Sequence, residues 1–304
     1  MELLYWFESI RTPVLDAIMS VVTRMGEETI FMVIAMLVFW CIDKRKGYYL
    51  LSVGFVGTLI NQWLKIVCRI PRPWVLDPDF RIVESAREAA TGYSFPSGHT
   101  QSAVGTFGGI ARFTSRAWLR VICIVLALMT AISRMYLGVH TPLDVGVSLI
   151  VAAVLIFVLY PLFESTLWFP NRMYVIIGVM LIFSLSFVGF MEFYPFPADV
   201  DAANLASAVK NAYTMTGAVA GMLVVYAFDT KIVRFSTYAP WWGQLIKLVG
   251  GLALAVGVKA LLKAPLLALC GGHEVAHALR YFALVLVAGC IWPMTFRLYK
   301  KFTR

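Results

Sequence analysis

Long apolar segments recur along almost the whole chain, and they constrain its fold more than any other feature. The sequence is 60% hydrophobic and only 14% charged, whereas soluble proteins contain about 45–50% apolar and about 25% charged residues. A helix needs roughly 20 apolar residues to cross a bilayer. Nine segments approach that length: 27–42, 48–68, 99–113, 120–138, 142–163, 173–194, 210–228, 244–264 and 277–296. The sequence therefore predicts an all-α, polytopic membrane helix bundle with about nine transmembrane spans.

Residues 3–23, which precede the first predicted span, carry apolar residues at helical spacing on one side and polar residues on the other. This pattern predicts an amphipathic helix that lies in the membrane interface. The first residues lack a basic leader and a small-residue cleavage site. We therefore expect no cleavable signal peptide.

Basic residues in the short loops predict the orientation of the bundle. In a nine-span topology they collect on one side, which should be cytoplasmic: Lys44, Arg45, Lys46, Arg112, Arg116, Arg120, Lys231, Arg234, Arg297, Lys300, Lys301 and Arg304. The loops at 69–98 and 134–141 then face outward. We attribute the net charge of +9 to this topology and to contact with anionic lipids. No nucleic-acid partner is expected.

Three short blocks of polar residues lie in or beside these outward loops, and the first contains Lys65 and Arg72. Lys65 falls late in a predicted span, and the prolines at 71 and 73 should end that helix. Two cations would then lie at the membrane surface. Alternatively, both side chains snorkel towards lipid head groups, as basic residues at helix ends commonly do.

The second block is Pro96, Ser97, Gly98 and His99, directly before an apolar helix. Ser97 is a good N-cap, and the N–H groups of Gly98 and His99 would point outward from the helix start. Such a terminus binds phosphate readily, because its donors are aligned and its dipole end is positive. The alternative is simple capping beside an incidental histidine.

The third block runs from Ser133 and Arg134 to His140 and Asp144. Thr141 and Asp144 have the spacing of a capping box, which is one explanation for the aspartate. Asp144 is also placed to accept a proton from one ring nitrogen of His140. That contact would orient the imidazole and make its other nitrogen a better nucleophile. Arg134 is free to join the cations of the first block.

Together the three blocks resemble the type 2 phosphatidic acid phosphatase family, which also includes the vanadium haloperoxidases. The family pattern is K-x6-R-P, then P-S-G-H, then S-R-x5-H-x3-D, and the sequence matches every specified position between residues 65 and 144. The resemblance implies a phosphatase-like catalytic six-helix core over 1–165, formed by the interfacial helix and the first five spans. Additional C-terminal transmembrane helices would occupy 166–304.

The resemblance also implies a metal-independent phosphatase that uses no cofactor. His140 would attack phosphorus and form a phosphohistidine, Asp144 would orient it, and His99 would protonate the leaving group and then activate water. The groups that would hold the phosphoryl oxygens are Lys65, Arg72, Arg134, Ser97 and the backbone amide of Gly98. We expect no metal, because three cations and a helix terminus already supply positive charge to the reacting group.

The expected function is hydrolysis of a lipid phosphate or diphosphate by an integral membrane enzyme, at the extracytoplasmic face of the cell membrane. A polyprenyl diphosphate is the first candidate substrate, and phosphatidic acid or a related glycerolipid phosphate is the second. A lipid phosphotransferase would use the same phosphohistidine, and an acceptor assay separates the two. A non-enzymatic lipid transporter or scaffold is disfavoured, because no catalytic position has been lost.

A rival motif lies near the C-terminus, where His273, Glu274 and His277 form the H-E-x-x-H of zinc proteases. After His277 the chain contains no Asp, Glu or His, and Cys290 is its remaining potential ligand. The cysteines show no C-x-x-C spacing that would supply a zinc site. An intramembrane metalloprotease is therefore the remote alternative, and a solvated helix start is the favoured interpretation.

Lys259 and Lys263 lie four residues apart near the outward end of a predicted span. Ionisable groups in membrane helices are candidates for function. We expect these lysines to contact a lipid head group or a diphosphate at the outer face, and snorkelling is the alternative.

Overall fold

The computed structural model describes residues 1–88, 90–164 and 171–302, and every regular element in these residues is helical. The chain separates into two compact units. Unit 1 comprises Met1–Ile34, Tyr49–Pro161 and Val200–Leu205, and unit 2 comprises Ala35–Tyr48, Leu162–Asp199 and Ala206–Arg304. The boundary that the sequence predicts between 165 and 166 lies outside the described residues.

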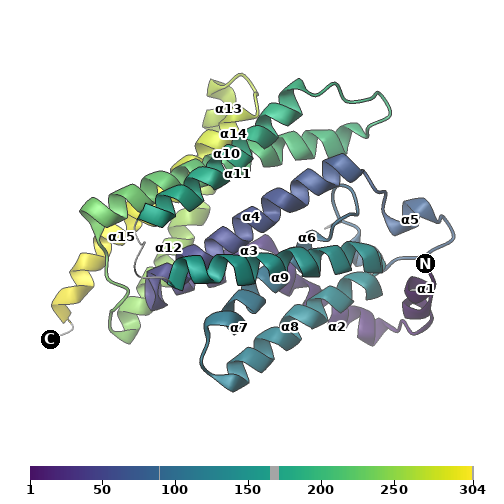
Figure 1. Ribbon diagram of the computed structural model, residues 1–304, viewed down its shortest axis with the longest axis horizontal. Helices are drawn as coiled ribbons and strands as arrows, with labels where there is room; N and C mark the ends of the chain where they lie inside the picture. Colours follow the sequence, from purple (N-terminus) through teal and green to yellow (C-terminus); the bar gives the residue numbers. More distant parts are fainter. Residues whose placement is uncertain (89, 165–170, 303–304) are drawn as a thin grey trace. The chain divides into compact units, whose positions relative to one another are not determined.

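Unit 1 holds the helices that carry all three sequence blocks (Figure 1). Its elements, three of which continue into unit 2 at one end, are α1 (Glu2–Ser9), α2 (Pro13–Thr23), η1 (Arg24–Gly26), α3 (Glu28–Leu37), α4 (Lys44–Cys68), α5 (Pro73–Leu76), η3 (Glu84–Ala86), α6 (Gly98–Ala103), η4 (Val104–Gly108), α7 (Gly109–Phe113), α8 (Ala117–Tyr136) and α9 (Pro142–Glu164). Helices α2, α6 and α7 pack against α8. Helix α6, which carries His99, therefore packs directly against α8, which carries Arg134.

Unit 2 is formed mainly by the C-terminal helices. Its elements are η2 (Val38–Ile42), α10 (Asn171–Phe193), α11 (Ala202–Phe228), η6 (Asp229–Val233), α12 (Trp241–Leu261), α13 (Lys263–Leu269), α14 (Val275–Leu286), η7 (Val287–Ile291), α15 (Trp292–Met294) and η8 (Thr295–Phe302). Gly217 of α11 lies against the backbone of α14, because a Cβ at this position would lie 2.0 Å from the Ala278 carbonyl oxygen. The absence of a side chain at Gly217 therefore permits the close α11–α14 contact.

The membrane spans are fewer than the sequence predicts. Within the described residues, seven helices are long and apolar enough to cross a membrane, or eight if the bent pair Pro13–Gly26 and Glu28–Ile42 forms one span. The prediction of nine is therefore wrong. The segment predicted at 27–42 meets the length requirement only together with the preceding helix, across a 51° bend. The segment at 99–113 is a short helical stretch with a π-helical middle. Both fall below the roughly 20 residues that a bilayer requires.

The N-terminal amphipathic segment is also not one helix, because α1 and α2 are separated around Thr12. Thr12 has an extended backbone, with φ −141° and ψ 153°, and its hydroxyl accepts a hydrogen bond from the Leu15 backbone N–H. Pro13 occupies the first helical position. A threonine N-cap followed by proline starts a new helix. The location of this segment in the membrane interface stays a prediction.

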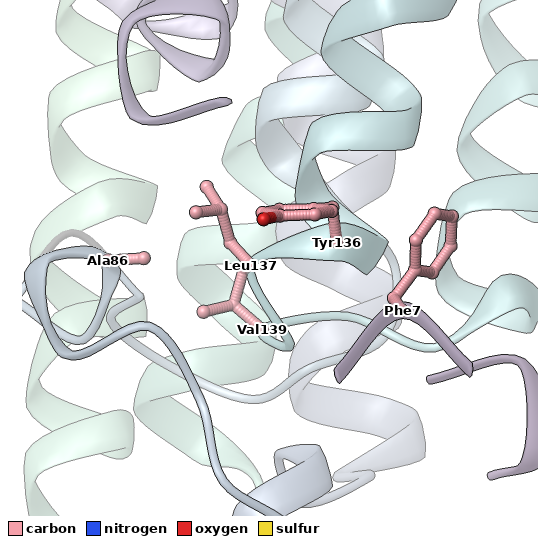
Figure 2. Close-up of a cluster of buried hydrophobic side chains, with 5 residues drawn as sticks. All are labelled: Phe7, Ala86, Tyr136, Leu137 and Val139. Carbon is pink, nitrogen blue, oxygen red and sulfur yellow. The ribbon is translucent and has the colours of Figure 1, made fainter. Parts of the chain in front are cut away.

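A small hydrophobic cluster holds the turn that leads from α8 to His140 (Figure 2). Its buried members are Phe7, Ala86, Tyr136, Leu137 and Val139. The rings of Phe7 and Tyr136 pack edge to face at 6.0 Å. Arg11 reinforces this contact, because its Nε and Nη2 donate to the Tyr136 carbonyl oxygen at 3.1 and 2.9 Å. The cluster thus fixes the backbone just before the candidate nucleophile.

Candidate active site

Arg72 lies in an extended segment between the end of α4 and the start of α5. The chain leaves α4 after Cys68 through Arg69, whose φ of +49° is left-handed, and Pro73 begins α5. The guanidinium of Arg72 donates to the carbonyl oxygens of Thr91, Gly92 and Val139 at 2.7, 3.0 and 2.9 Å, respectively. Its side chain is buried. These contacts are inconsistent with snorkelling towards lipid head groups.

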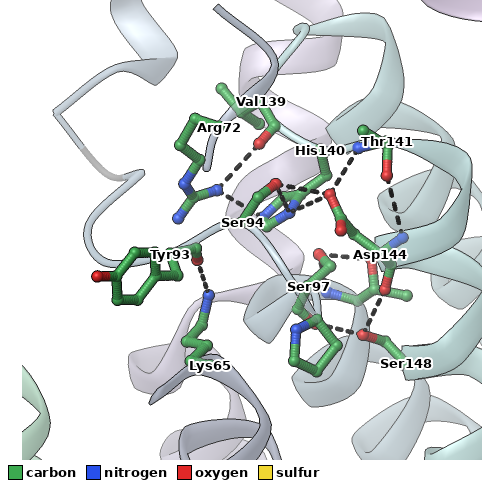
Figure 3. A network of polar contacts seen from close by, with 12 residues as sticks. Lys65, Arg72, Tyr93, Ser94, Ser97, Val139, His140, Thr141, Asp144 and Ser148 are labelled. Carbon is green, nitrogen blue, oxygen red and sulfur yellow. Dashed lines mark hydrogen bonds and ion pairs between the residues drawn. The ribbon is translucent and has the colours of Figure 1, made fainter. Parts of the chain in front are cut away.

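Lys65 reaches the same loop from the last turn of α4. Its Nζ donates to the Tyr93 carbonyl oxygen (Figure 3). The loop that precedes the Pro96–His99 block is thereby joined to both cations of the first block. Both cations therefore contact residues 91–93, and their role in binding phosphate stays a prediction.

His140 is buried, and its two ring nitrogens face opposite charges. Nε2 lies 3.0 Å from Nη1 of Arg72, and Nδ1 lies 3.5 Å from Oδ2 of Asp144. A guanidinium can only donate hydrogen bonds. Nε2 must therefore act as the acceptor, which places the ring proton on Nδ1, towards Asp144. This tautomer leaves the lone pair on Nε2, the nitrogen opposite Asp144, which is the one predicted to act as nucleophile.

Asp144 forms the predicted capping box and also faces His140. Its Oδ2 accepts from the Thr141 backbone N–H at 2.7 Å, and its own N–H donates to the Thr141 hydroxyl at 3.3 Å. Oδ2 also accepts from the Ser94 hydroxyl at 2.6 Å. Oδ1 is buried and has no hydrogen-bond partner among the described residues. The capping role and the contact with His140 are thus compatible.

Ser97 caps the helical stretch that begins at Gly98, as the sequence predicts. The Ser97 hydroxyl accepts from the backbone N–H and the hydroxyl of Thr100 at 3.4 and 2.9 Å. These bonds use its lone pairs and leave its own proton available for donation. A Cβ at Gly98 would meet only Asn61 Oδ1, at 3.8 Å. Space is therefore available for an anion to approach the start of this helix.

Arg134 is the third cation, and it comes from the last turn of α8. It is 1% exposed, its Nη1 donates to the Thr23 hydroxyl at 2.7 Å, and its Nε has no partner within the described residues. Its charge acts on both His99 and His140. The structure therefore brings all three predicted cations to the two predicted histidines.

Both histidines are held in the neutral state by their surroundings. Burial, and then the charges of Arg134, Arg72 and Lys65, lower the pKa of His99 to about 3. Burial and the same cations also hold the pKa of His140 well below its ordinary value. In the described part of the chain, the carboxylate that acts on Lys65 and Arg72 is that of Asp144. Because three cations exceed one carboxylate, the arrangement favours a bound anion.

Ser94 and Thr23 contribute to this cluster without having been predicted from the sequence. Ser94 lies in a polar loop and binds Asp144. The composition of that loop does not indicate which of its residues reaches the site. Thr23 binds Arg134 from α2, where the amphipathic pattern indicates only a surface helix. A Cβ at the nearby Gly26 would lie 2.5 Å from the His99 carbonyl oxygen. The end of the α2 segment therefore packs directly on the candidate site.

The rival H-E-x-x-H motif does not have the geometry of a zinc site. A zinc protease carries both histidines on one helix face. Here α14 begins at Val275, and His273 precedes it, with Nδ1 accepting from the Val275 N–H at 3.1 Å. His277 Nε2 lies 3.3 Å from Glu274 Oε2. Among the residues with described placement, no group of three or more His, Cys, Asp or Glu side chains could hold a metal ion. The helix-start interpretation therefore fits better.

The sequence has relatives of known activity. It is 30% identical over 152 residues to the undecaprenyl-diphosphatase BcrC of Bacillus subtilis (strain 168), which covers 48% of this chain and 74% of that protein. It is 29% identical over 133 residues to an undecaprenyl-diphosphatase of Sulfolobus acidocaldarius, covering 43% and 62%, respectively. It is also 29% identical over 153 residues to phosphatidylglycerophosphatase B of Bacillus subtilis, covering 45% and 69%. No solved structure matches the chain.

Two family profiles account for most of the sequence. Residues 45–168 match the PAP2 superfamily, and residues 213–304 match the PAP2 superfamily phosphatase, transmembrane extension. The first match contains every residue of the candidate site described above except Thr23 and Gly26, which precede residue 45. The second covers much of unit 2. This integral, multi-pass membrane protein therefore belongs to the PAP2 superfamily of phosphatases and carries its transmembrane extension.

Proposed function

We propose that the protein hydrolyses a lipid phosphate or diphosphate through a covalent phosphohistidine on His140. The observation that carries this proposal is the 3.0 Å contact between Arg72 Nη1 and His140 Nε2. Because a guanidinium can only donate, this contact supports a lone pair on Nε2, which faces a group able to bind a phosphoryl oxygen. A nucleophile oriented by a neighbouring carboxylate and facing fixed positive charge has the arrangement needed for covalent catalysis.

In the first step, the substrate phosphoryl group displaces Arg72 from Nε2, and the guanidinium transfers its hydrogen bond to a phosphoryl oxygen. Nε2 then forms the N–P bond while the bond from phosphorus to the leaving oxygen breaks. The imidazole becomes a cation, and its Nδ1 proton remains directed at Asp144 Oδ2. The carboxylate stabilises the charge that develops on the ring.

His99 supplies the proton to the leaving oxygen. In the empty site its pKa is lowered to about 3 by burial and by the three cations. A bound phosphate dianion offsets those cations and raises this pKa, so that the imidazole takes up a proton when substrate arrives. After donating it, neutral His99 accepts a proton from the water that attacks phosphorus. The N–P bond then breaks and releases phosphate and neutral His140.

Charge at the phosphoryl oxygens is stabilised by Lys65, Arg72 and Arg134, with the Ser97 hydroxyl and the Gly98 amide as further donors. Phosphoryl transfer depends mainly on positioning and on electrostatic stabilisation of these oxygens. Because the donors are fixed by contacts to backbone and side chains before substrate arrives, little reorganisation is needed during the reaction.

A polyprenyl diphosphate is the first candidate substrate, because two of the relatives above are undecaprenyl-diphosphatases. A glycerolipid phosphate is the second, supported by the likeness to phosphatidylglycerophosphatase B. We further propose a location in the cell membrane, with the reacting residues at the extracytoplasmic face.

The test is release of phosphate from a panel of lipid phosphates by detergent-purified protein in EDTA. Wild type, His140→Ala and the matched control His273→Ala are compared, with and without an alcohol acceptor. We expect release by wild type and by His273→Ala, and none by His140→Ala. Release that persists in His140→Ala would contradict the proposed nucleophile. Phosphate that appears only on the added acceptor would identify a phosphotransferase instead.

A further inference from the structure

Unit 2 contains a buried cation that the reaction does not use. Arg280 of α14 is 6% exposed, and its Nε has no hydrogen-bond partner among the described residues. Its guanidinium carbon lies 5.2 Å from the Tyr281 ring centre. None of the ion pairs found within the described ranges includes it. A buried, unpaired charge within a membrane-spanning segment is energetically costly, so it is a strong candidate for ligand binding.

Other cations gather around the same end of α14. Helix α13, which begins at Lys263, packs against α14, and the charges of Arg280, Glu274, Lys210 and Lys263 all act on His277 of α14. Lys259 lies in the same neighbourhood, because its Nζ lies 5.7 Å from the Tyr281 ring centre. The three lysines are exposed, whereas Arg280 is buried. The cluster therefore has a buried guanidinium and an accessible basic rim.

Two carboxylates, those of Glu274 and Glu192, lie in this neighbourhood, and Glu274 Oε2 has no hydrogen-bond partner among the described residues. Glu274 Oε2 faces His277 Nε2 at 3.3 Å. Glu192 Oε1 accepts a hydrogen bond from the Tyr213 hydroxyl at 3.1 Å. The Tyr213 ring in turn packs edge to face on His273 at 5.6 Å. The four cations Arg280, Lys210, Lys259 and Lys263 exceed these two carboxylates by two charges, and an anion is the ligand that would offset the remainder.

We infer that unit 2 holds a second anion-binding site, centred on Arg280 and rimmed by Lys210, Lys259 and Lys263, that binds the phosphate group of a membrane lipid. Arginine binds phosphate through two parallel hydrogen bonds, and the lysines add charge at the rim. Lys259 and Lys263 lie where α12 ends and α13 begins, and Arg280 lies in the first half of α14. In this account Glu274 and His277 tune the charge of an anion site, which gives the H-E-x-x-H residues a role without zinc. The inference does not depend on the reaction proposed above.

The test counts tightly bound phosphatidic acid by native mass spectrometry of the full chain, with His140→Ala in every sample to prevent turnover. We expect two bound molecules in this parent, one after Arg72→Gln and one after Arg280→Gln. Loss of charge-assisted hydrogen bonds should weaken the Arg280 site about tenfold or more. An unchanged count after Arg280→Gln overturns the second site, whereas an unchanged count after Arg72→Gln counts against the proposed active site.

A second pair of variants tests the site even if Arg280→Gln does not fold. Lys210→Gln combined with Lys263→Gln removes two exposed charges from the rim and should also weaken binding about tenfold. Arg45→Gln combined with Lys231→Gln removes two exposed charges elsewhere in unit 2 and should leave binding unchanged. Equal binding by both double variants overturns the inference.

Phosphatidylcholine should bind more weakly than phosphatidic acid. Inorganic phosphate that binds as tightly as phosphatidic acid would contradict a lipid ligand.

Discussion

Nη1 of Arg72 lies 3.0 Å from Nε2 of His140, while the other ring nitrogen faces Asp144 at 3.5 Å. The arginine thus lies where the phosphorus of a substrate would approach the proposed nucleophile. Three backbone carbonyl oxygens accept three of the four remaining guanidinium hydrogens. Arg72 therefore has two roles in this account: it selects the tautomer of His140 in the empty site and binds the substrate when it arrives.

Replacing Arg72 with lysine should reduce kcat/KM by about 10²-fold or more, because a compact ammonium cannot bond three carbonyl groups and a phosphoryl oxygen at once. Phosphate release in detergent measures the change. Arg87→Lys is the matched control, since Arg87 pairs with Glu84 on the exposed part of the same loop. If Arg72→Lys and Arg87→Lys have equal activity, the guanidinium geometry has no part in catalysis.

Ser94→Ala should lower kcat while leaving KM largely unchanged. The Ser94 hydroxyl donates to Asp144 Oδ2 at 2.6 Å, so its loss frees the carboxylate that orients His140. Removing a hydrogen bond to a charged group costs about 1.5–3 kcal/mol. If this loss raises the activation free energy by the same amount, the rate falls roughly tenfold or more. Steady-state kinetics provide the test. Ser184→Ala removes a buried serine hydroxyl from α10 and should be nearly silent. A rise in KM alone would argue that Ser94 binds substrate instead.

Gly26→Ala should both destabilise the protein and reduce activity. The new Cβ would lie 2.5 Å from the His99 carbonyl oxygen and 2.9 Å from its Cβ, so α6 must move. Overpacking of this kind costs about 1–3 kcal/mol. Gly178→Ala is the control, because a Cβ there meets nothing within 4 Å. Thermal unfolding and phosphate release are measured on both variants. Wild-type values for Gly26→Ala would show that the α2 end does not constrain His99.

Stability should fall as the pH drops below about 6.5, the ordinary value for histidine in an unfolded chain. The pKa of His99 is lowered to about 3, and that of His140 is also well below its ordinary value. Because both folded-state pKa values are depressed, the stability they contribute is complete above pH ~6.5 and is lost towards the folded-state values. Each histidine adds a slope of about 1.4 kcal/mol per pH unit within that window.

Unfolding in detergent from about pH 7.5 to about pH 5 measures this slope. A variant carrying His99→Asn and His140→Asn should show a flatter dependence, because neither side chain can take up a proton on unfolding. His273→Asn, at an exposed position, should retain the wild-type slope. An equally steep dependence in the double variant would assign acid sensitivity to other groups.

The local geometry of the candidate site could be predicted from the sequence better than the membrane topology could. Capping at Ser97 and the box of Thr141 and Asp144 follow from local backbone geometry, so short-range pattern is sufficient to find them. The segments at 27–42 and 99–113 are apolar but short, and hydropathy alone cannot show that one continues from α2 across a bend. Ser94 and Thr23 reach the cluster through long-range contacts, which leave no signal in a single sequence.

The most direct test of the account is to trap the covalent intermediate. Protein is mixed with a labelled lipid diphosphate, quenched in base within a single turnover, and digested for mass spectrometry. His99→Ala should accumulate the intermediate, since the second step lacks its base. The account predicts phosphate on the peptide that contains His140, acid-labile and absent from His140→Ala. Two results would contradict this mechanism. One is turnover by wild type without phosphorylated His140 in either wild type or His99→Ala. The other is turnover with phosphate on another residue.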